Sequence, residues 1–236
     1  MHKPLQIIKL GGSLLKLADL PERLEQLIQS QPQYDHAIVV GGGGAANVVR
    51  EWDRVHQLRR RASHDLAVHS LQLTARFLTE LIPASGLANR RDAVRIMIAH
   101  GRLPVIDMVE FLDRYEAEMQ ISLPHDWSLT SDSLALWVSS VLKADSLLLA
   151  KSISCPTEKS LDLASANQSV DEHFPWLWRD VKAHNRQPGL QWANLRSEIV
   201  RPISWDAQAM AIPPVLPQQG TQQLRDEAHL CHGLSW

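Results

Sequence analysis

Two glycine turns are the first candidates for chemistry in this sequence. Gly11 and Gly12 directly follow the apolar run Leu5–Leu10. Four further glycines, at 41–44, follow a second apolar run at 37–40. A glycine turn after a strand lets the backbone approach an anion, because no Cβ is in the way. It also directs free N–H groups and the positive end of the next helix at that anion. The two turns therefore favour phosphate binding.

Three charged residues are predicted to lie beside these turns. Lys9 precedes the first turn, Lys151 ends the apolar run 146–150, and Asp132 lies in the first turn of a predicted helix. Because ligands bind at the carboxyl ends of parallel strands, we expect the two ammonium groups to flank the carboxylate there. Phosphoryl transfer needs mainly positioning and charge neutralisation, so Lys9, Asp132 and Lys151 are the candidate catalytic residues. The alternatives are a solvated lysine at a strand end and an aspartate that pairs with a helix dipole.

The elements that would position these residues alternate between strands and helices. Strands are predicted at 5–10, 37–40, 103–106, 146–150 and 198–201, and helices at 20–28, 45–55, 63–82, 93–98, 131–142 and 174–181. Such alternation predicts a three-layer αβα sandwich with a mainly parallel central sheet. The helix over 63–82 has one apolar side, formed by Leu66, Leu73, Phe77 and Leu81. Residues 154–172 are predicted to be a loop, and an irregular tail is predicted from residue 202.

Composition limits the partners of the chain. It has 236 residues, with 24 Lys and Arg against 26 Asp and Glu, so its net charge of −2 favours neither nucleic acid nor a membrane surface. We find no signal-peptide pattern and no run of about 18 apolar residues, and we therefore expect a cytoplasmic protein. His56, His64 and His69 have spacings that do not stack two of them on one helical face, so no metal site is predicted.

Three segments together resemble the amino-acid-kinase superfamily. They are IIKLGGSLL at 7–15, VVGGGGAANVVRE at 39–51 and SLTSDSLALWVSSVLKADSLLLAKS at 128–152, in the order found in that superfamily. The superfamily includes acetylglutamate, glutamate, aspartate, uridylate and isopentenyl-phosphate kinases. The resemblance implies the amino-acid-kinase fold, also called carbamate-kinase-like, and phosphoryl transfer from ATP with Mg²⁺ bridging the nucleotide phosphates. It also implies a homodimer formed through the helix before the second lobe.

Further segments are similar to one branch of that superfamily. DWSLTSDSLA at 126–135, the lysine in LLLAKS and SVDEHFPWL at 169–177 resemble the small kinases of methanofuran biosynthesis, in methanopterin-linked one-carbon metabolism. This resemblance implies a small-molecule acceptor, an alcohol such as aminomethyl-furanmethanol. The alternatives are a kinase for a carboxylate or a nucleoside monophosphate, for which the run Arg59 to Arg61 would supply basic residues, and a catalytically degenerate binding or regulatory protein of the same fold.

The resemblance also assigns roles to individual residues. Lys9 would contact the transferring phosphate, and Asp132 would organise the lysines. The residues expected to bind the nucleotide phosphates are Gly11, Gly12, Ser13, Lys151 and Ser152. The residues expected to bind the acceptor are Gly42, Gly43, Gly44, Asn47 and Asp171. Asp171 is equally compatible with a helix cap. No residue is assigned as a metal ligand.

One departure from the superfamily concerns the nucleotide side. After the strand ending at Ala150 the superfamily usually has an Asp-Gly turn, whereas this chain reads KSISCP at 151–156. A later glycine-rich stretch with a lysine is also missing. We therefore expect a single domain over 1–236, with an acceptor-side lobe over about 1–125. A trimmed nucleotide-side lobe with an irregular tail would then occupy about 126–236.

Overall fold

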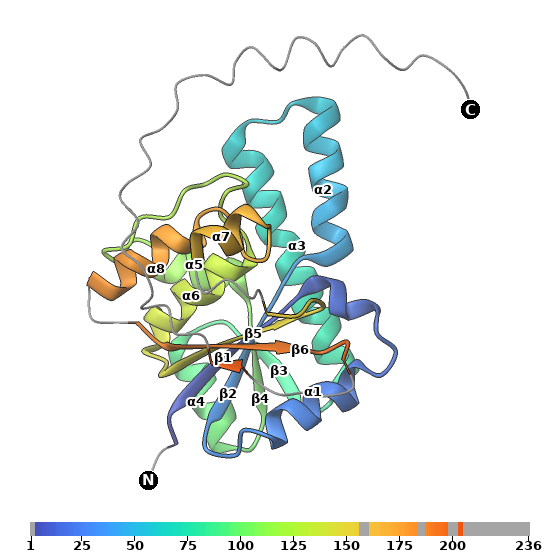
Figure 1. Ribbon diagram of the computed structural model, residues 1–236, viewed down its shortest axis with the longest axis vertical. Coiled ribbons are helices and arrows are strands. Elements are labelled where there is room, and N and C mark those ends of the chain that lie inside the picture. Colours follow the sequence, from blue (N-terminus) through green and yellow to red (C-terminus); the bar gives the residue numbers. More distant parts are fainter. Residues whose placement is uncertain (1–2, 156–160, 184–186, 198–202, 205–236) are drawn as a thin grey trace.

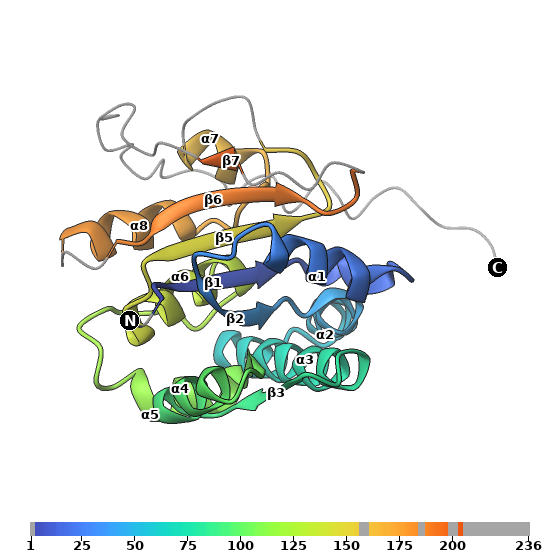
Figure 2. The same cartoon turned by 90° about the horizontal axis from the view of Figure 1, so that it is seen from below.

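The computed structural model describes residues 3–155, 161–183, 187–197 and 203–204, and its centre is one sheet (Figure 1). The strands follow the spatial order β3-β4-β2-β1-β5-β6-β7, with β3 at one end of the sheet and β7 near the other (Figure 2). Their bounds are β1 Leu5–Leu10, β2 Asp35–Val40, β3 Ser85–Ala88, β4 Leu103–Ile106, β5 Ser146–Lys151, β6 Gly189–Asn194 and β7 Ile203–Ser204. All neighbouring pairs are parallel except β6 and β7.

Helices cover both faces of this sheet, which confirms the predicted αβα fold class. They are α1 Leu20–Gln29, α2 Gly43–His56, α3 Arg60–Leu81, α4 Arg91–Ala99, α5 Met108–Tyr115, α6 Ser131–Leu142, α7 Leu161–Ala166 and α8 Phe174–Ala183, together with the 3-10 helix η1 Gly12–Lys16. One core lies between the sheet and a layer that includes α6 and α8, and the other contains α1. Within the described ranges, no helix is long and apolar enough to cross a membrane.

Strand alternation decides where the two lysines point. Successive side chains of a strand face opposite sides of the sheet, so Ile7 belongs to the core that contains α6, whereas Ile8 belongs to the core that contains α1. Lys9 therefore shares the side of Ile7 and faces α6. In β5 the same rule places Lys151 on the side of Leu149, which also belongs to the α6 core. Because β1 pairs with β5, both lysines approach α6 from neighbouring strands.

The packed side of α3 is not the side marked by its largest apolar residues. Exposed fractions between 36% and 59% are found for Leu66, Leu73, Phe77 and Leu81. The buried side instead mixes apolar and small polar residues, namely Ser63, His64, Val68, Ser70, Leu71, Thr74, Ala75 and Leu78. Short side chains are buried here because α3 packs closely against α2, where Ser70 lies next to Gly42. The predicted apolar side is consequently left facing outwards.

Other differences from the predicted elements involve short segments. The predicted loop 154–172 is wrong in part, because α7 forms within it; α7 buries Ala164 and is joined to α8 by an ion pair between Asp162 and Arg179. The strands β3 and β6 and the helix α5 were not predicted. Both strands contain glycine, which weakens the strand pattern. The strand predicted at 198–201 lies outside the described residues, as does the tail beyond residue 204. The tail was predicted to be irregular from residue 202, but residues 203–204 form β7, which pairs with β6.

Candidate active site

Lys9, Asp132 and Lys151 meet in one buried ion-pair cluster. Lys9 Nζ lies 2.8 Å from Asp132 Oδ1, and Lys151 Nζ lies 2.6 Å from Asp132 Oδ2. Lys9 and Asp132 are each 4% exposed, and the Lys151 side chain is 12% exposed. The carboxylate thus holds two ammonium groups side by side at the carboxyl end of the sheet. This is the arrangement expected from the sequence.

The two glycine turns are in direct backbone contact. A Cβ added to Gly12 would lie 2.2 Å from the amide nitrogen of Gly43, so neither turn tolerates a side chain at this point. Gly43 has a φ of 54°, a conformation that glycine adopts without strain. Gly44, by contrast, has no atom within 4 Å of its added Cβ and opens onto free space. Gly12 and Gly43 therefore allow the two turns to pack closely, whereas Gly44 leaves open space next to them.

A cleft of about 370 Å³ lies over these turns. Among the predicted binding residues, it is lined by Gly12, Ser13, Gly42, Gly43, Gly44 and Asn47. Gly11, Ser152, Asp171 and the three charged residues of the cluster are not part of its wall, although Ser131, next to Asp132, is. Ser152 is connected to the cleft through Ser13, because the two hydroxyl oxygens lie 2.9 Å apart. The ion-pair cluster thus lies beside the cleft and has little contact with solvent.

The match to a known family fits this geometry. The family model described as the amino acid kinase family matches residues 4–154, which include both glycine turns and the whole ion-pair cluster. This chain belongs to the amino acid kinase family. It is therefore a phosphotransferase of the nucleotide-dependent kinase type, and its sheet, helices and turns are those of an amino acid kinase.

Individual amino acid kinases resemble the chain to different degrees. [5-(Aminomethyl)furan-3-yl]methyl phosphate kinase of Methanocaldococcus jannaschii is 28% identical over 190 residues, which cover 75% of this chain and 84% of that protein. UMP kinase from Ureaplasma parvum has a TM-score of 0.58 at 13% identity and covers 84% of this chain and 93% of its own. Aspartate kinase from Synechocystis has a TM-score of 0.56 at 13% identity and covers 86% of this chain and 40% of its own. The two structures share the amino-acid-kinase fold with this chain.

Burial and mutual attraction set the protonation of the cluster in this amino acid kinase. Burial alone would raise the pKa of Asp132, but Lys151 and Lys9 together outweigh it and hold that pKa at about 2. Burial lowers the pKa of Lys151 to about 8, although Asp132 opposes the change. At neutral pH the cluster therefore carries one negative and two positive charges. The surplus positive charge is suited to a phosphoryl group.

The lowered pKa of Lys151 predicts a loss of activity at alkaline pH. The folded protein loses the proton of Lys151 near pH 8, below the ordinary value of 10.5, so kcat/KM for the phosphoryl donor should fall as pH rises through about 8. Arginine stays charged throughout this range. In the Lys151→Arg variant, residual activity should therefore lack this decline. A pH–rate profile of both proteins tests the assignment, and an identical alkaline decline in the two would refute it.

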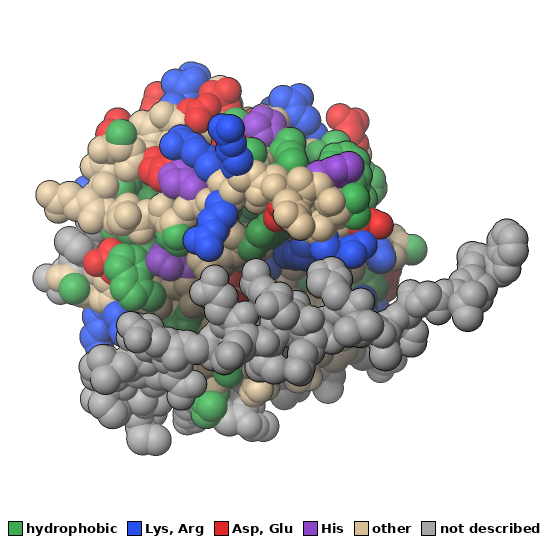
Figure 3. All heavy atoms as spheres, turned by 90° about the horizontal axis from the view of Figure 1, so that it is seen from above, with side chains coloured by type: hydrophobic (Ala, Val, Ile, Leu, Met, Phe, Trp, Pro, Cys, Tyr) green, Lys and Arg blue, Asp and Glu red, His purple; other side chains and the backbone are tan. Residues whose placement is uncertain are grey.

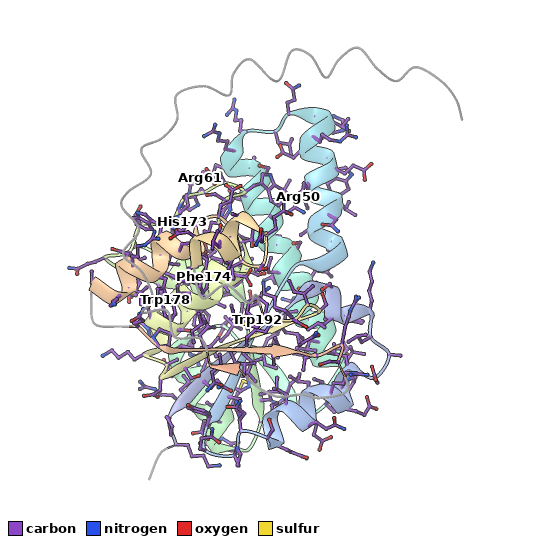
Figure 4. All side chains as sticks on the ribbon, viewed as in Figure 1. Arg50, Arg61, His173, Phe174, Trp178 and Trp192 are labelled. Carbon is purple, nitrogen blue, oxygen red and sulfur yellow. The ribbon has the colours of Figure 1, made fainter. Side chains whose placement is uncertain are left out.

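The structure also reveals an aromatic and cationic wall that the motifs did not single out. Trp127 lines the cleft, and the guanidinium carbon of Arg50 lies 4.6 Å from its ring centre. Arg50 projects from α2 towards the middle of the molecule (Figure 4) and donates a hydrogen bond of 3.0 Å to Asn47. Trp127 Nε1 donates to Asp53 at 2.7 Å, which fixes the ring. Both residues lay within the quoted motifs, but only the fold brings them together.

Arg59, Arg60 and Arg61 do not contribute to this wall. All three are exposed at the start of α3, and none of them lines the cleft. Figure 3 shows Lys and Arg side chains gathered with His on the face around the upper ends of α2 and α3 in Figure 1. The cleft has other cationic residues, Lys16, Arg50 and Arg196. Any acceptor phosphate in the cleft would therefore meet these residues and not the arginine run.

Asp171 has the contacts of a helix cap. Its carboxylate accepts hydrogen bonds from the backbone nitrogens of Thr130, Ser133 and Phe174, each at 3.0 Å. It also accepts from the hydroxyls of Thr130, at 2.9 Å, and Ser133. These contacts support the helix-cap alternative for Asp171, because they occupy both of its oxygens. Its predicted role as an acceptor ligand has no support from the lining of the cleft.

Proposed function

We propose that this protein transfers the γ-phosphoryl group of ATP to a small acceptor held in the cleft over the glycine turns. The observation that carries the proposal is the buried cluster in which Asp132 holds Lys9 and Lys151 side by side next to that cleft. Phosphoryl transfer depends mainly on positioning and on stabilising charge on the transferring group, and two fixed ammonium groups provide both. A strong general base is not needed, because the transition state is largely dissociative.

The donor and the acceptor would bind on opposite sides of the contact between the turns. We assign the donor phosphates to Gly11, Gly12, Ser13, Lys151 and Ser152, and the acceptor to Gly42, Gly43, Gly44 and Asn47. The hydrogen bond between Ser13 and Ser152 supports this division, because it joins the turns after β1 and β5. In this arrangement the assigned acceptor residues all lie within 1–125, whereas the donor site combines the first glycine turn with Lys151 and Ser152 from beyond residue 126.

Magnesium would enter with the nucleotide. In the part of the chain that the structure describes, no group of three His, Cys, Asp or Glu side chains is placed to hold a metal ion. We propose MgATP as the donor, because Mg²⁺ commonly binds through substrate phosphates and water. Such a reaction, supplied by cellular ATP, fits a cytoplasmic protein.

We propose that the acceptor is a phosphate ester, whose phosphate receives the transferred phosphoryl group. The sequence favoured an alcohol, but the relative from Methanocaldococcus jannaschii is named for a furanylmethyl phosphate, and the structural neighbour from Ureaplasma parvum for UMP. The cleft offers Lys16, Arg50 and Arg196 to such a phosphate and the Trp127 ring to a planar aromatic group. We therefore propose an aromatic methyl phosphate, with [5-(aminomethyl)furan-3-yl]methyl phosphate as the first candidate. The product would be the corresponding diphosphate.

An ADP-release assay tests this function. The purified protein is mixed with MgATP and, in separate reactions, with the furanylmethyl phosphate, the free furan alcohol, UMP and a carboxylate. We expect turnover with the furanylmethyl phosphate and little with the others. Turnover of the free furan alcohol alone would instead support the alcohol acceptor that was expected from the sequence. If no acceptor reacts and calorimetry detects no binding of MgATP, the degenerate binding protein becomes the better description.

We further propose that two copies associate through α3. The outward-facing apolar residues Leu73 and Phe77 are 59% and 45% exposed on the longest helix of the described chain, and a second copy would bury them. The wild type should sediment as a dimer, whereas the double variant Leu73→Asp, Phe77→Asp should sediment as a monomer. Trp176→Asp, which changes an exposed residue of α8, should leave the dimer intact. A monomeric wild type would refute the proposal.

A further inference from the structure

One carboxylate connects the segment before α8 to the first turn of α6. Asp171 Oδ2 accepts from the backbone nitrogen and the hydroxyl of Thr130 and from the backbone nitrogen of Ser133. Its other oxygen accepts from the hydroxyl of Ser133 and from the backbone nitrogen of Phe174. Figure 4 shows Phe174 near the beginning of α8, on the side of the molecule where α6 lies. A single side chain thus caps two helices.

This cap takes the place of the one that α6 lacks. Thr130 is the N-cap residue of α6, but its side chain makes no capping hydrogen bond within the helix. The first amide groups of a helix have no partner inside the helix, and an anion near them is stabilised by the helix dipole. Asp171 supplies both the acceptor and the anion from a segment about 40 residues further along the chain. The orientation of the first turn of α6 therefore depends on Asp171.

Asp132 lies inside the turn that Asp171 holds. It stands between Thr130 and Ser133, and its own carboxylate makes no hydrogen bond to this turn; it is directed at Lys9 and Lys151. We propose that Asp171 is a positioning residue of the phosphotransfer site, which fixes the first turn of α6 and so keeps Asp132 between the two lysines. The kinetic test of this inference rests on the proposed function, whereas the hydrogen bonds and ion pairs from which it is argued are independent of that function.

Charge gives the inference a second, independent consequence. The charged groups that face Lys151 are Asp132 on α6, Lys9 on β1 and Asp171 before α8. The negative charge of Asp171 raises the pKa of Lys151, so its removal should make Lys151 lose its proton at lower pH. The three backbone N–H groups at Asp171 can only donate, which favours the ionised carboxylate even though burial and Asp132 raise its pKa. A helix cap remote from the lysines would have no such effect.

The test compares Asp171→Asn with the matched control Asp162→Asn. Asp162 is an acidic residue on α7 that pairs with Arg179 at the surface and, among the described residues, forms no hydrogen bond or ion pair with α6. We expect Asp171→Asn to lower kcat by about 10- to 100-fold with little change in KM, because small displacements of catalytic groups have effects of this size. Its alkaline decline in kcat/KM should begin at lower pH than in the wild type. Asp162→Asn should match the wild type in both respects.

A spectroscopic measurement separates this inference from the proposed function. Lysine labelled with ¹³C at Cε reports the titration of Lys151 by NMR, with its signal assigned through its loss in Lys151→Arg. In Asp171→Asn this titration should move to lower pH while the protein remains folded. If no acceptor is ever turned over, the proposed function fails, but the titration still decides this inference.

One result that would overturn the inference is a folded Asp171→Asn variant that melts at a lower temperature than the wild type but keeps the wild-type pH profile and the wild-type titration of Lys151. It is also overturned if Asp162→Asn causes the same changes. Should Asp171→Asn fail to fold, Asp171→Glu replaces it, because glutamate keeps the charge but displaces the cap. That variant should lose kcat and retain the alkaline decline near pH 8, and a wild-type kcat in Asp171→Glu would refute the positioning role.

Discussion

Replacing Lys9 with alanine should lower kcat by about 10³-fold or more, which corresponds to about 4 kcal/mol of lost transition-state stabilisation. Lys9 Nζ lies 2.8 Å from Asp132 and is fixed by burial, so it stabilises charge on the transferring group without reorganising. Its removal leaves Asp132 paired with Lys151 alone and removes the surplus positive charge. The ADP-release assay measures the loss, with circular dichroism to confirm the fold.

The control for this prediction is another lysine of the same chain. Lys182 is exposed in the last turn of α8, far in sequence from the glycine turns, and Lys182→Ala should keep the wild-type kcat. Lys9→Met tests packing, because methionine replaces most of the aliphatic stem without the charge. It should be as inactive as Lys9→Ala but more stable. Retention of more than about a tenth of the wild-type kcat in Lys9→Met would show that this charge does not act in catalysis.

The change Asp132→Asn should affect both activity and stability. It leaves two buried ammonium groups side by side without the carboxylate that each now contacts within 2.8 Å. Removing one partner of a buried ion pair costs about 3–5 kcal/mol. For a chain of this length such a loss lowers the melting temperature by roughly 10 °C. Because the lysines also move apart, kcat should fall by about 10²-fold or more.

Calorimetric melting and the ADP-release assay measure these two effects of Asp132→Asn. The stabilising contribution of Asp132 is present above its ordinary pKa of 3.8 and is lost as pH falls through about 2. The melting temperatures of the variant and the wild type should therefore converge at strongly acidic pH. A variant that melts like the wild type at neutral pH would contradict the ion-pair geometry. Asp162→Asn, at an exposed ion pair, should change the melting temperature little.

The charged cluster was predictable because it depends on regular geometry. Lys9 and Lys151 end apolar strands, and strands of one parallel sheet bring their carboxyl ends together. Asp132 occupies the first turn of a helix whose pattern could be read from residues 131–142. Strand parity, together with the side on which α6 packs, then determines that the three side chains meet. Local pattern and topology agree here, so the prediction did not depend on any single long-range contact.

Other features depend on contacts that no local pattern records. The stacking of Arg50 on Trp127 joins residues 77 positions apart, and neither neighbourhood shows which partner it will meet. A helix cap was one of the two alternatives that the sequence offered for Asp171, but its contact with the first turn of α6 becomes evident only when α8 packs against α6. On α3, the large apolar residues suggested the wrong packed side, because small residues such as Ser70 are what allow α2 to approach closely. On the side of α3 that packs against α2, the space between the two helices and not hydrophobicity determines which side chains fit.

The contact between Gly12 and Gly43 has a consequence for how such an enzyme can diverge. In the proposed arrangement, main-chain atoms alone set the distance between the donor phosphates and the acceptor, since no side chain separates the two glycine turns where Gly12 meets Gly43. Substitutions along α2, such as at Asn47 or Arg50, can therefore change which acceptor binds without increasing the distance over which the phosphoryl group is transferred. The same main-chain spacing between the two turns can therefore be kept while the acceptor changes.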